Sequence, residues 1–326
     1  MTLSVLVTTR SFGREVPEPM ERLRQAGIRI LEWREGSGLD EADLEAKLQE
    51  ADAWIVAFHP IGSELLVRAP RLRLIAKHGV GLDNIDLPAA TARGIAVTTA
   101  PGANDQAVAD LTLALVLALL RRVPEASASV KVGRWERFLG AGLAGKAFGI
   151  LGLGRIGMAV AARAKGFGVE LLAADPNWPE AAARALGIRR AEPETLFAEA
   201  DVLTLHPPLT SETAGLIGER ALACMKRGVW IVNTSRGKVV DEKAMYQALI
   251  AGQVAGYATD VFETEPPVGN PLLGLPNVIA TPHTGAHTRE SLALMGHRAA
   301  DAVLSLLRGE RPKFVVNPEV WQRKED

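Results

Sequence analysis

The chain has 326 residues, of which 48% are hydrophobic and 23% are charged, and its 37 basic residues nearly balance its 38 acidic residues. A chain of this length exceeds the usual size of one hydrophobic core, so two domains are expected. The composition excludes an intrinsically disordered chain, and the charge balance argues against the basic face that a nucleic-acid-binding protein presents.

Cys224 is the only cysteine. A lone thiol forms no internal disulfide, which favours a reducing, cytoplasmic setting. Within the helix-like segment 219–228 this small residue is expected to be buried rather than catalytic. The longest apolar run, residues 111–120, has about half the length that a transmembrane helix requires and predicts a buried helix. Residues 1–10 lack the features of a signal peptide and are typical of a first strand.

Strand-like and helix-like segments alternate from the N-terminus onward. The predicted strands cover residues 3–9, 28–33 and 52–58, and the predicted helices cover residues 18–27 and 40–51. Asp40 stands where it would cap the second helix. The series continues through residues 65–79 and 94–102. Such alternation predicts a parallel sheet with helices on both faces.

A long helix is predicted over residues 105–122, and a second series of alternating strands and helices follows. Its predicted strands lie within residues 145–154, 169–175, 200–208, 228–235, 254–262 and 277–283. Residues 288–310 predict another long helix, and residues 313–316 a final short strand. Because that last piece is too small to fold alone, we expect it to complete the first domain. The expected domains are residues 1–103 with 288–326, and residues 104–287 as an insertion.

The segment GILGLGRIG places Gly152, Gly154 and Gly157 in G-x-G-x-x-G spacing between a predicted strand and a predicted helix. The first glycine permits a tight turn, the second lets the backbone approach a pyrophosphate, and the third lets helix and strand pack closely. The helix N-terminus offers free N–H groups to the anion. Asp175 ends the next strand, where a carboxylate accepts hydrogen bonds from an adenosine ribose and repels a 2′-phosphate. NAD is therefore expected rather than NADP; the alternative is a glycine-rich turn with a capping aspartate.

Three successive strands of this second series end in residues suited to chemistry. Arg236 follows one strand beside a glycine, where a guanidinium suits a carboxylate held by two parallel hydrogen bonds. The next strand end offers Asp260, Glu263 and Glu265, and the one after it offers His283. Because strand C-termini line the ligand crevice of an open parallel sheet, arginine, glutamate and histidine are expected at one edge.

Motifs from both halves of the chain resemble the D-isomer-specific 2-hydroxyacid dehydrogenases, a group that includes D-3-phosphoglycerate, glyoxylate/hydroxypyruvate and D-lactate dehydrogenases. The motifs are GLGRIG, NTSRG, DVFETEP, TPHTGAHT, HGVGLDNID and GANDQAVAD. The resemblance covers nearly the whole chain. It implies an α/β fold in which a Rossmann-type NAD-binding domain is inserted into a flavodoxin-like substrate domain, both with parallel sheets. The end at Asp326 leads us to expect a short form without the regulatory domain of long phosphoglycerate dehydrogenases.

The resemblance also implies roles for individual residues. Arg236 would bind the substrate carboxylate and carbonyl, His283 would be the acid/base, Glu265 would pair with it, and Asp260 would contact the nicotinamide amide. The implied cofactor-binding residues are Gly152, Gly154, Arg155, Ile156, Gly157, Asp175, His206, Pro207, Thr234, Ser235, Arg236, Asp260, His283 and Gly285. The implied substrate-binding residues are Lys77, His78, Gly79, Val80, Gly81, Asn104 and Arg236.

For Lys77 and His78 two interpretations stay open. In the first, both residues bind the substrate and hold a second anionic group. In the second, they are two solvated basic residues at a strand end. The sequence does not decide between them, and it leaves the identity of the 2-hydroxy acid open.

The chemistry agrees with the implied roles. Reduction of a 2-keto acid needs a hydride at carbon, which NADH would supply, and a proton at oxygen, which an imidazolium would supply. A neighbouring carboxylate favours the imidazolium and raises the pKa of a histidine. A metal pair formed by His283 and His287 needs helical spacing, which Gly285 interrupts, and a third ligand is not evident, so no metal is expected. A packed histidine is the remaining alternative.

The same fold supports other functions, and the sequence bears on each. Formate dehydrogenase pairs its histidine with glutamine, so Glu265 argues against it. A phosphite or other small-anion dehydrogenase keeps arginine, glutamate and histidine and stays open as an alternative. An NADH-sensing corepressor-like binding protein is disfavoured because no basic tail is visible. The family builds a two-fold dimer from helices near residues 105–137, so a homodimer is expected, without nucleic-acid or membrane partners.

Overall fold

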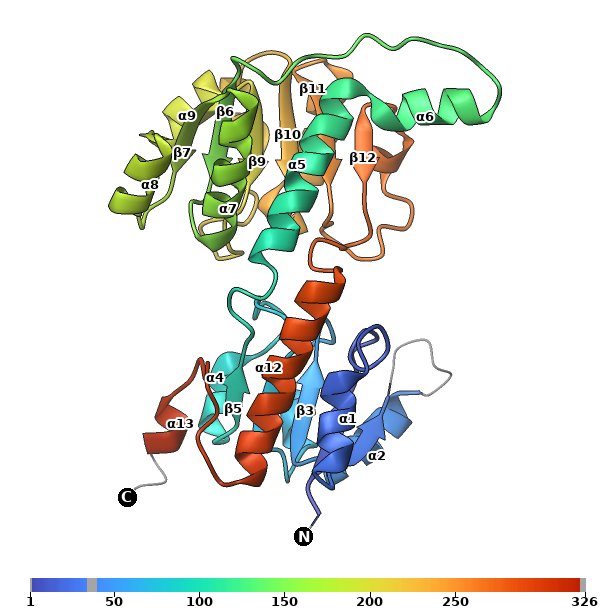
Figure 1. Cartoon of the computed structure of the whole chain (residues 1–326), viewed down its shortest axis with the longest axis vertical. Helices are drawn as coiled ribbons and strands as arrows, with labels where there is room; N and C mark the ends of the chain where they lie inside the picture. Colours follow the sequence, from blue (N-terminus) through green and yellow to red (C-terminus); the bar gives the residue numbers. More distant parts are fainter. Residues whose placement is uncertain (1, 34–39, 323–326) are drawn as a thin grey trace. The chain divides into compact units, whose positions relative to one another are not determined.

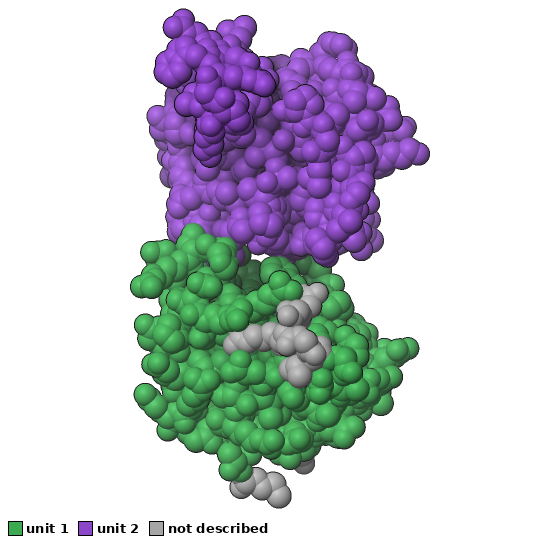
Figure 2. All heavy atoms as spheres, turned by 90° about the vertical axis from the view of Figure 1, so that its right-hand side faces the viewer, with its two compact units in different colours: residues 1–104, 287–326 green, residues 105–286 purple. Residues whose placement is uncertain are grey.

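The structure is a computed structural model in which residues 2–33 and 40–322 are described. The chain divides into two compact units (Figure 2). Residues 1–104 and 287–326 form unit 1, and residues 105–286 form unit 2. The expected boundaries, 103/104 and 287/288, differ from these by one residue at each crossing.

Unit 1 contains a parallel sheet whose described strands follow the order β2-β1-β3-β4-β5. The strands are β1 Ser4–Val7, β2 Arg29–Glu32, β3 Ala53–Val56, β4 Leu74–Lys77 and β5 Ala96–Thr98. Neighbouring strands pair in parallel, with Val5 opposite Ala53 in the β1–β3 pair. This order is the flavodoxin-like one, which confirms the fold class expected for the first domain.

Helices cover both faces of this sheet. One core lies against α1 Glu18–Gln25 and α12 Arg289–Leu307, which run side by side in Figure 1. The other core lies against α2 Glu41–Glu50, α3 Ser63–Val67 and α4 Leu87–Ala92. Successive residues of a strand point to opposite faces, so Ile55 belongs to the first core and Trp54 to the second. Both faces are covered, and the inner strands β1, β3 and β4 are accordingly buried along their whole length.

Asp40 caps α2, as the sequence predicts. Its Oδ1 accepts a hydrogen bond from Asp43 N at 2.9 Å, and Asp43 Oδ2 accepts one from Asp40 N at 3.0 Å. This reciprocal pair satisfies N–H groups that a helix start otherwise leaves free.

The C-terminal segment returns to unit 1, but the strand predicted for residues 313–316 is wrong. Only an isolated antiparallel bridge between Thr98 and Val315 forms there among the described residues. Phe314 has φ 60°, a left-handed conformation that interrupts an extended run. The segment is held by Asn317 instead. Its Oδ1 accepts from Val97 N at 2.8 Å, and its Nδ2 donates to Ile95 O at 2.9 Å, before the short helix α13 Glu319–Gln322.

Unit 2 contains a parallel sheet with the described strand order β12-β11-β10-β9-β6-β7-β8. The strands are β6 Ala147–Leu151, β7 Glu170–Ala174, β8 Arg189–Arg190, β9 Val202–Leu205, β10 Val229–Asn233, β11 Val254–Thr259 and β12 Val278–Ala280. With β6 as the first strand, the order is that of the Rossmann fold with one further strand. The strands pair in parallel, which confirms the class expected for the inserted domain.

Helices also cover both faces of the unit 2 sheet. One core lies against α5 Asp105–Arg121, α7 Arg155–Ala164 and α8 Glu180–Leu186. The other lies against α9 Pro193–Glu199, α10 Glu219–Cys224 and α11 Glu242–Ile250. The apolar run 111–120 belongs to α5 and contributes Leu113, Val116 and Leu120 to the first core, as predicted.

A second short helix and an irregular arm follow α5. Arg122, with φ 53°, separates α5 from α6 Val123–Lys131, and residues 132–144 then run to β6. Figure 1 shows α6 and this arm extending beyond the sheet of unit 2. Several apolar side chains of the arm are exposed, Trp135 to 82% and Leu139 to 94%.

Two expectations from the bulk composition can be compared with the structure. Cys224 is exposed, so the expectation of a buried thiol is wrong. It ends the short helix α10, in which Leu222 turns toward the core, as does Met225 just after it. None of the helices formed by residues 2–33 and 40–322 combines the length and apolar character needed to span a bilayer.

Candidate active site

The glycine-rich turn joins β6 to α7, and its close contacts require glycine. Gly152 has φ 89°, and a Cβ there would lie 2.8 Å from the carbonyl carbon of His206. A Cβ on Gly157 would overlap the carbonyl oxygen of Gly152. At Gly154, by contrast, a Cβ would meet no atom within 4 Å, so the turn is open where the helix begins.

The start of α7 fits a pyrophosphate. Gly154 is its N-cap, and no side chain of the described residues caps it. The first N–H groups of the helix therefore remain for an anion, which the positive end of the helix dipole also attracts. Arg155 lies at this start, where its Nε is 2.6 Å from Asp105 Oδ2 and its side chain stays 69% exposed. The next residue, Ile156, is half-buried against the core beneath α5 and α7.

Asp175 lies beside the glycine-rich turn at the end of β7. Its Oδ2 accepts a hydrogen bond from Leu153 N at 2.6 Å, and its Oδ1 accepts one from Asn177 N at 2.7 Å. Asp175 is half-buried, so its carboxylate remains partly accessible beside the glycine-rich turn. Arg190 lies on the neighbouring strand, and its guanidinium stacks 5.5 Å from the centre of the Trp178 ring. The segment after Asp175 therefore has a cation beside it that residues 176–178 do not themselves supply.

His206 and Pro207 follow β9 and close the other side of the turn. The backbone of His206 is in contact with Gly152, and both of its ring nitrogens are buried without a hydrogen-bond partner among the described residues. Burial lowers the pKa of His206 to about 3, so the ring is neutral. Unpartnered buried nitrogens beside the glycine-rich turn fit a position against a polar cofactor.

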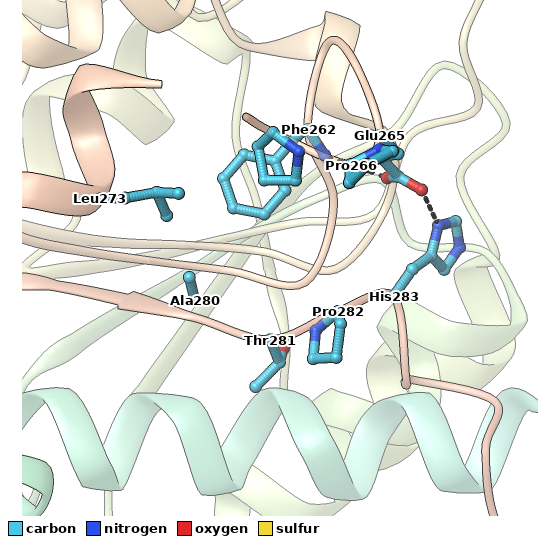
Figure 3. Close-up of a pocket in the computed structure, with 9 residues that line it drawn as sticks. Phe262, Glu265, Pro266, Leu273, Ala280, Thr281, Pro282 and His283 are labelled. Carbon is cyan, nitrogen blue, oxygen red and sulfur yellow. Dashed lines mark hydrogen bonds and ion pairs between the residues drawn. The ribbon is translucent and has the colours of Figure 1, made fainter. Parts of the chain in front are cut away.

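Glu265 and His283 come together at the ends of two adjacent strands. β10, β11 and β12 are neighbours in the sheet, and Arg236, Glu265 and His283 follow them in that order. His283 Nδ1 lies 2.8 Å from Glu265 Oε2, as the dashed line in Figure 3 marks. Both side chains remain partly accessible, 28% for His283 and 36% for Glu265. The pair is thus open to a small substrate while its two members are in contact.

The charge of Glu265 is set by its neighbours. Burial favours the protonated acid, but four other influences outweigh it and leave the pKa of Glu265 lowered. They are the hydrogen bond from His283, the charge of His283, the N–H of Phe262 at 3.1 Å and the charge of Arg236. The carboxylate is therefore ionised at neutral pH. Arg236 and His283 both act on it electrostatically, which joins the three strand ends into one charged cluster.

The turn that carries Arg236 is held by Asn233, which is fully buried. Asn233 Nδ2 donates to Arg236 O at 2.9 Å, and Asn233 Oδ1 accepts from Ser235 N at 3.0 Å and from Ser235 Oγ at 2.8 Å. Thr234 is also buried, with its Oγ1 2.8 Å from Thr112 Oγ1 of α5. The guanidinium donates to Ser235 O at 2.7 Å, which fixes its direction at this strand end.

Asp260 is buried just past β11 and contacts the loop that carries His283. Its Oδ2 accepts a hydrogen bond from Gly285 N at 2.7 Å, and its Oδ1 accepts one from Thr284 N at 2.8 Å. The structure thus places Asp260 and Gly285 together, within unit 2 and next to His283.

An apolar pocket of 380 Å³ lies beside the His283–Glu265 pair (Figure 3). Its lining residues are Phe262, Glu265, Pro266, Pro267, Leu273, Ala280, Thr281, Pro282 and His283. The two polar groups of the pair are on the boundary of this apolar surface. Apolar surroundings strengthen a hydrogen bond between charged groups, because water competes with it less.

In unit 1, the structure argues against a positive charge at His78. The ring is buried with its edge against Phe12, and Nδ1 lies 3.5 Å from Ser11 Oγ. Burial lowers the pKa of His78 to about 4, so the ring is neutral at physiological pH. Lys77 is buried as well, and its Nζ donates to Ala57 O and to Asn84 Oδ1. Neither residue is the solvated base that one interpretation of the sequence expects, and His78 supplies no cation for a second anionic group.

The segment after Lys77 and His78 forms a surface turn. Gly79 O accepts a hydrogen bond from Ala100 N at 2.9 Å, and Val80 is 37% exposed. Gly81 is partly exposed, so backbone groups of this turn are accessible in unit 1. Asn104 is the last residue of unit 1 before the chain enters unit 2. Among the residues that the structure describes, no three histidine, cysteine, aspartate or glutamate side chains are grouped as metal ligands are.

Sequence reasoning missed several residues that shape this site. Asn233 orients the Arg236 turn, the N–H of Phe262 bonds Glu265, and Thr281 donates to Asp260 at 2.6 Å. The signal that could have found them is their place beside a charged residue in the motifs NTSRG, DVFETEP and TPHTG. Polar residues flanking a strand end are the natural hydrogen-bond partners of the groups found there.

Comparisons with known proteins place this arrangement in a family. The family model described as "D-isomer specific 2-hydroxyacid dehydrogenase, NAD binding domain" matches residues 113–285. D-3-phosphoglycerate dehydrogenase of Methanocaldococcus jannaschii is 43% identical over 311 residues, which cover 93% of this chain and 59% of the relative. Glyoxylate reductase of Thermococcus litoralis is 40% identical over 317 residues, which cover 94% of this chain and 96% of the relative.

A solved structure shows the same similarity in three dimensions. The crystal structure of the TT0316 protein from Thermus thermophilus has a TM-score of 0.87 and 38% sequence identity, covering 96% of this chain and 100% of that chain. The chain thus spans about three-fifths of the first relative and nearly all of the second. The matched segment includes the glycine-rich turn, the ends of the strands and the His283 loop, and NAD is the cofactor of the matched domain. The chain belongs to the D-isomer specific 2-hydroxyacid dehydrogenase family.

Proposed function

We propose that this chain is an NAD-dependent dehydrogenase that interconverts a D-2-hydroxy acid and its 2-keto acid. The observation that carries the proposal is the 2.8 Å hydrogen bond between His283 Nδ1 and Glu265 Oε2, at strand ends adjacent to that of Arg236. The names of the relatives, D-3-phosphoglycerate dehydrogenase and glyoxylate reductase, support this class of substrate.

Each member of the cluster has a chemical task in this reaction. Bound NADH supplies the hydride that reduces the keto carbon. Because Glu265 engages Nδ1 of His283, Nε2 is the nitrogen that donates a proton to the keto oxygen, and it takes the hydroxyl proton in the opposite direction. The ionised carboxylate of Glu265 orients the imidazole through its hydrogen bond to Nδ1. Arg236 binds the substrate carboxylate by charge-assisted hydrogen bonds and polarises the carbonyl.

The other expected site residues extend this proposal. Unit 2 is the NAD-binding domain, with the start of α7 for the pyrophosphate and Asp175 for the ribose. Unit 1 is the substrate domain, and its turn at residues 79–81 offers backbone N–H groups to the substrate carboxylate. Since His78 is neutral and Lys77 is bonded to Ala57 and Asn84, the substrate we favour carries one carboxylate and no second anionic group.

A panel of acceptors tests the proposal directly. NADH oxidation is followed with glyoxylate, hydroxypyruvate, oxaloacetate and phosphohydroxypyruvate, and NAD reduction with phosphite and formate. We expect turnover of 2-keto acids, with kcat/KM highest for glyoxylate or hydroxypyruvate. NADH binding without flux on any 2-keto acid would contradict the proposal and favour a corepressor-like binding protein. Flux on phosphite alone would instead assign the site to a small-anion dehydrogenase.

We further propose that the protein is a cytoplasmic homodimer. The helix α6 and the arm that follows it, residues 132–144, expose Val130, Val132, Trp135 and Leu139. Apolar side chains gathered in one exposed segment are typical of an interface. The single cysteine supports a reducing compartment.

A further inference from the structure

The loop that carries His283 folds around the buried carboxylate of Asp260, which is 2% exposed. Oδ1 accepts hydrogen bonds from Thr281 Oγ1 at 2.6 Å, from Thr284 N at 2.8 Å and from Thr284 Oγ1 at 3.3 Å. Oδ2 accepts one from Gly285 N at 2.7 Å. The donors lie on both sides of His283 in the sequence, so one carboxylate ties the two arms of the loop together.

The backbone of His283 adopts a conformation that needs such support. Its φ is 52°, in the left-handed region that residues with a side chain adopt rarely. A residue in this region persists where its surroundings determine its conformation. The N–H of His283 donates to Asp260 O at 2.9 Å and to Thr281 O at 3.0 Å. From this backbone the ring points toward Glu265 (Figure 3).

The carboxylate of Asp260 also explains why position 285 is a glycine. A Cβ at this position would lie 3.0 Å from Asp260 Oδ2 and 3.3 Å from Cγ2 of Val108 in α5. A side chain would therefore press the carboxylate and the helix apart. Thr281, Thr284 and Gly285, three of the five residues of the segment TPHTG, thus have the same function of closing the loop on Asp260.

We propose that Asp260 is a positioning residue, whose carboxylate holds residues 281–285 in the conformation from which His283 Nδ1 meets Glu265 Oε2. The resemblance to known dehydrogenases implies another role, contact with the nicotinamide amide. Three of the loop's hydrogen bonds to Asp260 reach Oδ1 and one reaches Oδ2, so the carboxylate is engaged mainly with the loop. The effect on turnover rests on the proposed function, whereas the effect on the His283–Glu265 hydrogen bond does not.

A matched pair of variants at Thr281 tests the proposal. Valine has the shape of threonine without its hydroxyl, and serine keeps the hydroxyl. We expect Thr281→Val to lower kcat on the preferred 2-keto acid about tenfold and Asp260→Asn to lower it about 10²-fold, as a misplaced catalytic group does. Thr281→Ser should restore at least half of the wild-type kcat. The dissociation constant of NADH should stay close to its wild-type value.

Nuclear magnetic resonance of the imidazole gives a readout that does not depend on turnover. With ¹⁵N-labelled histidine, the downfield proton signal of the His283 Nδ1–H···Glu265 hydrogen bond should weaken in Thr281→Val and Asp260→Asn and persist in Thr281→Ser. An unchanged signal with unchanged kcat in Asp260→Asn would overturn the inference. So would a loss of NADH affinity with the signal intact, because it would assign Asp260 to the cofactor. If the wild-type chain turns over no 2-keto acid, the proposed function fails, and the signal alone decides the inference.

Discussion

His283, which follows β12, acquires its surroundings from the ends of two other strands. Glu265, which follows β11, bonds Nδ1, and the N–H of Phe262 holds the same carboxylate from behind at 3.1 Å. The charge of Arg236, after β10, lowers the pKa of Glu265 further. The imidazole of His283 therefore faces an ionised carboxylate at neutral pH.

Removing the charge of Glu265 should lower the rate of the proposed reaction. Glutamine keeps a hydrogen-bond acceptor for His283 Nδ1 but not the charge, so the hydrogen bond that orients the imidazole is weakened. In Glu265→Gln we expect kcat/KM for keto acid reduction to fall by about 10²-fold.

The neighbouring carboxylate Glu263 is the control for this change. It accepts a hydrogen bond from Glu242 N at 3.1 Å, away from the imidazole. Glu263→Gln should keep the wild-type kcat/KM. A Glu265→Gln protein with the wild-type kcat/KM would show that the carboxylate does not support His283 in the reaction.

The residue types at the strand ends could be predicted, and the family resemblance implied the pairing of Glu265 with His283, but the other hydrogen-bond partners were not predicted. Arg236, Glu265 and His283 each follow an apolar run, and a periodic pattern locates such positions. The donors Thr281 and Thr284 depend on the path of an irregular loop, which has no periodic signal. For His78 the sequence shows only that the residue follows a strand. In the structure its ring packs against Phe12, and the sequence pattern would be the same if the ring pointed to solvent.

At the scale of helices and strands, the glycine-rich turn could be predicted because backbone sterics dictate its glycines. Gly152 has a positive φ and contacts His206, and Gly157 leaves no space for a side chain. The strand predicted for residues 313–316 failed because an apolar run alone does not ensure pairing. The left-handed backbone of Phe314 interrupts the extended run, and the side chain of Asn317 makes the hydrogen bond to β5 in place of regular strand pairing.

Burial of His78, which follows β4, makes the free energy of unfolding depend on pH. The pKa of His78 falls from 6.5 in the unfolded chain to about 4 in the folded chain, so the unfolded state binds more protons between these values. Stability is therefore lost as pH falls from 6.5 toward 4, by roughly 2–3 kcal/mol from this residue. Replacing His78 with glutamine removes the titrating group. The decrease in the free energy of unfolding between about pH 7 and pH 4.5 should be smaller in His78→Gln than in the wild type.

His287, which is exposed, provides the matched control for this measurement. His287→Gln should lose stability with the wild-type slope in urea unfolding at the two pH values. Equal slopes for His78→Gln and the wild type would mean that the imidazole of His78 is solvated in the folded protein.

At the scale of the whole molecule, the division into two parallel-sheet units could be predicted, but the strand orders could not. Alternation of strands and helices predicts parallel sheets, and the short C-terminal piece implies a return to the first domain. The orders β2-β1-β3-β4-β5 and β12-β11-β10-β9-β6-β7-β8 depend on pairing between distant segments. Motifs identified the family, and the family supplied the fold that periodicity left open.

The exposed arm leads to a prediction about assembly. Light scattering after gel filtration should give twice the chain mass of 34.8 kDa. Introducing charge at its two most exposed apolar positions, with Trp135→Glu and Leu139→Glu together, should give a monomer because burying two carboxylates in an interface is costly. Val67, which is 64% exposed in α3 of unit 1, is the control, and Val67→Glu should remain a dimer. A monomeric wild-type protein would contradict the assignment of the arm to an interface.

The central claim is that His283 transfers the proton, and one measurement on His283→Ala tests it most directly. The dissociation constant of NADH and the turnover number for keto acid reduction are determined on the same preparation, beside His287→Ala as the control. The account predicts NADH binding close to that of the wild type and a turnover number lowered by about 10²–10⁴-fold. A His283→Ala protein that binds NADH and retains near-normal turnover would contradict it.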